Sequence, residues 1–142
     1  MHYAGPEGRV VGIDISQNEV KHATRRAESR GLNMKFITAD MENLPLPDGI
    51  IDVVISNGAF CLAPNKEKAF REIFRVLKPG GRMAICTSTV KMDLQPGVHW
   101  PICMRMFIHQ KAIEPMCKDI GFTNLKVDDE NSLMQYDIPE DA

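Results

Sequence analysis

The sequence carries no strong charge of either sign, and this absence narrows the classes of partner. Its 17 basic and 19 acidic residues give a formal net charge of -2 at pH 7, and no basic cluster interrupts the chain. Proteins that bind nucleic acid by neutralising phosphates need such a cluster. We therefore expect a small-molecule substrate and no nucleic acid partner.

Long hydrophobic runs are also missing. No apolar run approaches the roughly 20 residues that cross a bilayer, and no signal-peptide pattern opens the chain. The 142 residues are 44% hydrophobic and 25% charged, which suits one soluble domain with a buried core. We expect a cytoplasmic protein without membrane contact and a single domain over residues 1–142.

Cysteines at metal-binding spacing are absent. The chain has four cysteines and no C-x-x-C pair, so it lacks zinc-site spacing and the density of a disulfide framework. We predict no metal site. We also predict reduced and mostly buried thiols at Cys61, Cys86, Cys103 and Cys117.

What the chain does contain is an alternation of strand and helix signals. A β-branched strand over residues 10–14 precedes a helix over about 17–30. Ser16 and Glu19 form an S-x-x-E capping box at the start of this helix, and Gly31 permits the left-handed residue that ends it.

Three more strands and a helix follow in the same order. Residues 34–39 alternate as a short strand, and residues 51–56 are the strongest buried-strand signal. Asn65 caps a helix that stops before residues 78–81, and a strand over 82–87 comes next. One apolar face of this helix carries Phe70, Ile73, Phe74 and Leu77. Helices or long crossovers between the strands predict parallel pairing.

The C-terminal third has weaker signals. We predict a helix over residues 111–120 that ends at a glycine, with Pro115 kinking or shortening it. We also predict strands over residues 122–127 and 132–138.

Asp14, at the end of the first strand, lies where a parallel sheet presents a carboxylate to a nucleotide ribose, which indicates a nucleotide-type cofactor site.

Four segments in order resemble the S-adenosylmethionine-dependent methyltransferases with a Rossmann-like fold, especially the small-molecule branch that includes arsenite methyltransferases. They are residues 8–16, 39–48, 51–57 and 70–82. The resemblance implies an α/β fold with a mostly parallel sheet and flanking helices, S-adenosylmethionine as cofactor, and methyl transfer to a small-molecule acceptor.

The resemblance also assigns cofactor-binding roles to individual residues. Asp14 would hold the ribose hydroxyls, Asp40 would accept the adenine amino group, and Met41 would flank the adenine ring. The full set of implied cofactor residues is Asp14, Ile15, Asp40, Met41, Asn57 and Gly58. The alternative is that Asp14 and Asp40 only cap the helix or turn that follows each of them, and that Met41 is a core residue.

The chain departs from the family pattern at its start. The family places a first strand, a glycine-rich turn and a first helix before the strand that ends at Asp14, and this chain begins at Met1 without them. We therefore expect an N-terminally truncated domain that pairs its exposed sheet edges in a homodimer or rearranges its strands. The alternative function is a non-catalytic or truncated methyltransferase-like module for binding or dimerisation. A nicotinamide dehydrogenase would need G-x-G-x-x-G, which is missing here.

The substrate is less defined than the cofactor. Residues 90–107 are rich in methionine and aromatic side chains, and we predict that His99 and Trp100 bind substrate, with an ordinary packed loop as the alternative. No residue stands out as a dedicated nucleophile. Gly58 occupies the position of a thiol in the arsenite branch, and Cys61 comes three residues later, so arsenite is not the favoured acceptor.

Overall fold

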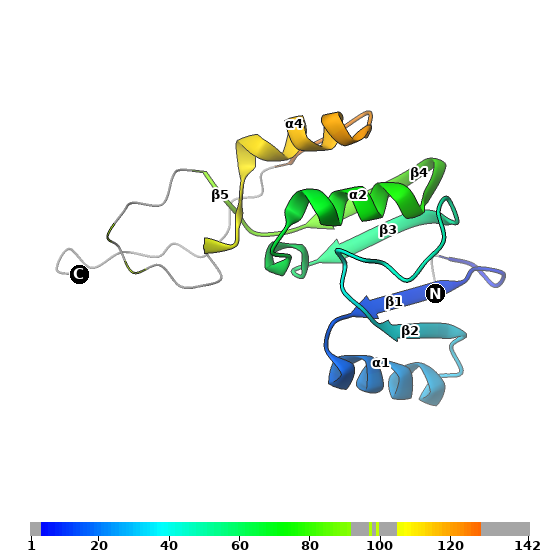
Figure 1. The fold of residues 1–142 in the computed structure, drawn as a ribbon. Helices are drawn as coiled ribbons and strands as arrows, with labels where there is room; N and C mark the ends of the chain where they lie inside the picture. Colours follow the sequence, from blue (N-terminus) through cyan, green and yellow to red (C-terminus); the bar gives the residue numbers. More distant parts are fainter. Residues whose placement is uncertain (1–3, 92–96, 98, 100–104, 129–142) are drawn as a thin grey trace.

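Parallel strands alternate with helices in the computed structural model, which describes residues 4–91, 97, 99 and 105–128 (Figure 1). This order confirms the predicted α/β class. In chain order the elements are β1 (Val10–Asp14), α1 (Gln17–Ser29), β2 (Met34–Thr38), β3 (Ile51–Asn57), the 3-10 helix η1 (Phe60–Leu62), α2 (Lys66–Val76), β4 (Leu77–Cys86), β5 (Thr89–Val90), β6 (Ile108–His109) and α4 (Gln110–Ile120).

The four longer strands form two separate parallel pairs. β1 pairs with β2, which places Asp14 opposite Thr38, and β3 pairs with β4, which places Asn57 opposite Cys86. In Figure 1, β1 and β3 are the neighbouring strands of the two pairs, and no hydrogen-bond ladder joins them. The predicted parallel pairing is confirmed. A rearrangement that joins β1 to β3 does not occur in the described residues.

Local capping explains where the two main helices begin. The Ser16 hydroxyl accepts a hydrogen bond from the Glu19 amide at 3.4 Å, and the Asn65 side chain accepts one from the Lys68 amide at 2.9 Å. α1 ends one residue earlier than predicted, and Gly31 follows with a φ of 62°. The Ser16 and Asn65 side chains each satisfy an amide group that has no backbone partner within the first turn of its helix.

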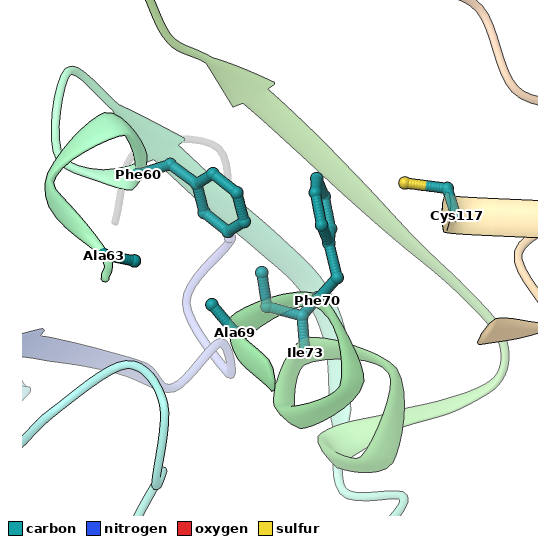
Figure 2. Packing of buried hydrophobic residues seen from close by; sticks show 6 residues of the cluster. All are labelled: Phe60, Ala63, Ala69, Phe70, Ile73 and Cys117. Atoms are coloured by element: carbon teal, nitrogen blue, oxygen red, sulfur yellow. The ribbon is translucent and has the colours of Figure 1, made fainter. Parts of the chain in front are cut away.

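The core lies between the β3–β4 pair and the helices α2 and α4 (Figure 2). The rings of Phe60 and Phe70 are 4.4 Å apart between centroids, and Ile73 of α2 and Cys117 of α4 are buried in the same cluster. α1 lies on the opposite side of the molecule from α2 and α4 (Figure 1). Ile55 of β3 points away from the cluster and is 79% exposed. One face of the β3–β4 pair is therefore packed and the other is open.

The strand after α2 begins earlier than predicted. β4 starts at Leu77, opposite Ile51, and the ladder shifts register before Val53 pairs with Arg82. The Pro-Gly-Gly sequence at 79–81 therefore lies inside an irregular strand, since glycine and proline are tolerated where a ladder is interrupted.

α4 tests one of the two expectations for Pro115. The helix spans Gln110–Ile120 with Pro115 inside it, so the helix is not shortened, and the kink stays a prediction. Proline removes one amide donor from the helix. The buried side chain of Cys117, which packs in the core cluster, holds the next turn in place.

The predicted strand over residues 122–127 is also wrong. These residues are irregular, and Asn124 has a φ of 54°, which is incompatible with an extended strand. Phe122 instead packs edge-on against Phe74, with ring centroids 5.1 Å apart. The predicted strand over 132–138 lies outside the described residues. Among those described, no helix has the length and apolar character of a membrane span.

Candidate functional site

The carboxyl ends of three strands carry the predicted cofactor residues. Asp14 ends β1, Asp40 comes two residues after β2 ends, and Asn57 ends β3. All three residues are exposed, and the arrowheads of β1, β2 and β3 point to the same side of the molecule (Figure 1). In open α/β sheets this is the edge at which ligands bind.

The Asp14 carboxylate has one oxygen engaged and one available. Oδ1 accepts a hydrogen bond from the Ser16 amide at 2.8 Å. The side chain therefore helps to start α1, in line with the alternative that Asp14 caps the helix that follows it. The second oxygen has no protein partner in the described part of the chain. Ile15, the next residue, is 74% exposed and offers an apolar surface beside the carboxylate.

Asp40 repeats this arrangement at the end of the neighbouring strand. Its Oδ1 accepts a hydrogen bond from the Glu42 amide at 2.9 Å, and its carbonyl accepts one from the Asn43 amide at 3.0 Å. The other carboxylate oxygen again has no partner among the described residues. Met41 is half-buried and packs against the core cluster, in line with the core alternative. Capping therefore uses only one oxygen of each aspartate.

Asn57 and Gly58 form the third part of this edge. Gly58 has a φ of 74°, its amide donates to the Cys86 carbonyl at 2.9 Å, and the space where a Cβ would stand is open. A glycine here lets a ligand approach the backbone closely. The Cys61 thiol donates to the Gly58 carbonyl at 3.4 Å.

The segment after Asp40 is fastened to α2 by a pair that the sequence did not reveal. Glu72 accepts a hydrogen bond from the Leu44 amide at 2.7 Å, and Arg75 donates to the Leu46 carbonyl at 2.7 Å. The hydrogen bond from Arg75 is the main reason that the pKa of Glu72 is lowered, and the Leu44 amide adds to the effect. Both residues lie off the apolar face of α2, where a hydrophobic pattern gives no signal.

Other predicted residues are only partly placed. His99 is exposed, while Trp100 lies outside the described residues, so their substrate role stays a prediction. Cys61 and Cys117 are buried and free as expected, and burial raises the pKa of the Cys117 thiol to about 11. Cys86 is exposed, which corrects the expectation for that residue, because its side chain lies on the open face of β4. Cys103 lies outside the described residues.

The described residues contain no group of three or more His, Cys, Asp or Glu side chains that could hold a metal ion.

Residues 1–130 match a protein family described as methyltransferase domain. The chain belongs to this family. The predicted resemblance is therefore confirmed over most of the sequence.

Relatives of this methyltransferase domain act on different small molecules by name. It is 39% identical over 82 residues to the arsenite methyltransferase of Halobacterium salinarum, which covers 57% of this chain and 21% of that protein. It is 42% identical over 80 residues to the demethylmenaquinone methyltransferase of Thermus thermophilus, covering 56% and 36%. The chain thus spans about a fifth to a third of the length of these curated relatives.

A solved structure confirms the fold. The crystal structure of an arsenic(III) S-adenosylmethionine methyltransferase from Chlamydomonas reinhardtii matches this methyltransferase domain with a TM-score of 0.73 and 28% identity. The match covers 84% of this chain and 45% of that one. The Rossmann-like arrangement expected from the sequence is therefore present in the part of the fold that this chain provides.

Proposed function

We propose that this methyltransferase domain binds S-adenosylmethionine at the edge formed by Asp14, Asp40 and Asn57 and serves methyl transfer to a small-molecule acceptor. The observation that carries the proposal is the pair of aspartates at the ends of adjacent parallel strands, each with one carboxylate oxygen available. Asp14 would accept hydrogen bonds from the ribose hydroxyls, and Asp40 would accept the adenine amino group.

The residues present fit such a ligand. Two acidic acceptors suit the hydroxyl and amino groups of adenosine, which are hydrogen-bond donors. The exposed Ile15 offers an apolar contact, and the open space at Gly58 admits the other end of the ligand. The proposed roles of Met41 and Asn57 are to flank the adenine ring and to line the methionine end.

The chemistry asked of the protein is mainly orientation. The cofactor, when bound, supplies a methyl group that its sulfonium already makes electrophilic. The polar edge of the domain then has to hold the adenosine end so that the methyl group faces the acceptor, and to exclude water from the approach. No protein nucleophile is required, in agreement with the absence of a dedicated candidate in the sequence.

We infer an organic acceptor rather than arsenite. Arsenite needs several accessible thiols, and two of the three described cysteines, Cys61 and Cys117, are buried. Burial raises the pKa of the Cys117 thiol further above neutral pH and so disfavours the thiolate, which is the metal-binding form. His99 and Trp100 remain the proposed acceptor contacts.

The proposal also includes a homodimer and a cytoplasmic location. The open edges of β1 and β3, and the exposed Ile55 beside them, support pairing with a second copy of the chain. The three free thiols at Cys61, Cys86 and Cys117 support a location in the reducing cytoplasm.

Calorimetric titration of the full chain tests the proposed function. We expect binding of S-adenosylmethionine and of its demethylated product S-adenosylhomocysteine, and no binding of NAD. Asp119→Asn is the matched control, because Asp119 is an exposed aspartate on α4, away from the proposed edge. Binding of neither sulfur compound would refute the proposal and favour the non-catalytic module.

A further inference from the structure

We propose that Arg75, together with Glu72, positions Asp40 for the cofactor by holding the connection between β2 and β3 against α2. This inference rests on the proposed function, because it concerns the same edge. The side chains of Arg75 and Glu72, with the groups of Leu44, Leu46 and Asp48 that they bind, are called the Arg75 clasp below.

The Arg75 guanidinium binds three points of the connection at once. Nη1 donates to the Leu46 carbonyl and to Asp48 Oδ1, both at 2.7 Å, and Nη2 donates to the Leu44 carbonyl at 3.0 Å. Nε and Nη2 also donate to the Glu72 carboxylate at 2.7 and 2.8 Å. A planar fork of five donors can make this set of contacts, and the compact ammonium group of lysine cannot.

Glu72 binds the same segment through its carboxylate. Its Oε2 accepts the Leu44 amide at 2.7 Å, so both backbone groups of Leu44 are bound by the clasp. The Glu72 side chain is 16% exposed and the Arg75 side chain is 30% exposed. Ion pairs on an open surface contribute little, whereas this pair is shielded and satisfies backbone groups.

The connection that the clasp holds also determines where Asp40 lies. Residues 39–50 link the β1–β2 pair to the β3–β4 pair, which share no ladder, and the extensive contacts of the described elements stay within each half. Glu42, whose amide closes the Asp40 turn, accepts the Asn65 amide at 2.6 Å at the start of α2. The placement of Asp40 relative to Asn57 therefore depends on how firmly this connection is held.

α2 also contains a second arginine–glutamate pair, which does not bind residues 39–50 in the described part of the chain and so serves as a control for the clasp. Arg71 and Glu67 form a salt bridge at 2.7 Å one turn earlier on the same helix, with side chains 57% and 53% exposed. Among the described residues Arg71 binds only Glu67. An Arg71→Ala change therefore removes an arginine and a helix salt bridge but leaves residues 39–50 bound.

The test uses the full chain and two measurements on Arg75→Ala, Glu72→Gln and Arg71→Ala. Hydrogen exchange of the free protein should become faster in peptides covering residues 41–48 for Arg75→Ala and stay unchanged for Arg71→Ala. Titration with S-adenosylhomocysteine should show at least a tenfold loss of affinity for Arg75→Ala, about 1.4 kcal/mol, and no loss for Arg71→Ala. Glu72→Gln keeps an acceptor for Leu44 but loses the charge, so it should fall between them.

A role confined to stability gives a different result. In that case Arg75→Ala would unfold at a lower temperature, while its folded fraction would bind S-adenosylhomocysteine as tightly as the wild type, and the inference would be overturned. Should Arg75→Ala fail to fold, Glu72→Gln decides by the same two measurements. A wild-type chain that binds no S-adenosylhomocysteine would instead refute the proposed function, and the exchange measurement would still report on the clasp.

Discussion

Replacing Asp14 by asparagine and by alanine separates its two roles. Its Oδ1 accepts the Ser16 amide at 2.8 Å, and its other oxygen has no partner among the residues that the structure describes. Asparagine keeps an oxygen that can accept the Ser16 amide but removes the negative charge, whereas alanine removes both functions. The two variants should therefore have similar losses of binding and different losses of stability.

The magnitudes follow from the two hydrogen bonds to the Asp14 carboxylate, one from the ligand and one from Ser16. A hydrogen bond to a charged group contributes about 1.5–3 kcal/mol, so loss of the charge at Asp14 should weaken S-adenosylhomocysteine binding by about 10- to 100-fold in both variants. The bond to Ser16 has the same charged acceptor, but it is exposed and water can replace it, so its loss in Asp14→Ala should cost only about 0.5–1 kcal/mol of unfolding free energy. Asp14→Asn should change the unfolding free energy by less than that.

Titration calorimetry and urea denaturation measure the two effects separately. Asp119→Asn controls for the loss of one surface carboxylate and should change neither quantity. The reasoning would be refuted if Asp14→Asn bound S-adenosylhomocysteine like the wild type. In that case capping would be the whole role of Asp14.

Three other perturbations test the core, the open sheet face and the clasp. Phe70→Ala should lower the unfolding free energy by about 3–5 kcal/mol in urea denaturation, because Phe70 is 3% exposed and its ring packs at a tilt against Phe60. Ile55→Lys should convert a dimer into a monomer in light scattering, and a monomeric wild type would contradict the proposed pairing. The folded-state pKa of Glu72 is lowered, so its contribution to stability is present above its unfolded pKa and is lost as pH falls through the folded value. The stability of the wild type should therefore fall more steeply than that of Glu72→Gln when the pH is lowered from 7 into the acid range below the ordinary glutamate pKa of 4.5.

Local sequence signals predicted the parts of the fold that depend on neighbouring residues. Ser16 and Asn65 cap their helices within three residues, and the predicted positions of α1 and α2 are correct to within a residue or two. The strand predicted over 122–127 failed because a strand needs a partner ladder, which an apolar pattern cannot supply. Asp14 was predicted as a cofactor residue from its position at the end of a strand, because ligands bind at the carboxyl ends of parallel strands, whereas Asp40 and Asn57 were predicted from the resemblance to the methyltransferase family.

The clasp escaped prediction for a different reason. Arg75 bonds to groups 27 to 31 positions away in the sequence, and no local pattern marks a residue for such a contact. The apolar face of α2 identified Phe70 and Ile73 and ignored the polar side of the same helix. Contacts of this kind emerge only when the fold has brought the two segments together.

Capping and ligand binding are compatible uses of the aspartates at this edge. A carboxylate that accepts a nearby amide loses rotamer freedom before any ligand arrives, and a group that is already ordered loses less entropy on binding. Asp14 is ordered by its turn and by the β1–β2 ladder, and Asp40 by its turn and by the clasp on the segment that follows. Asn57 is held by the β3–β4 ladder. Because each group is fixed by a different element, disturbing the clasp should affect the proposed adenine contact of Asp40 and leave the Asp14 turn intact.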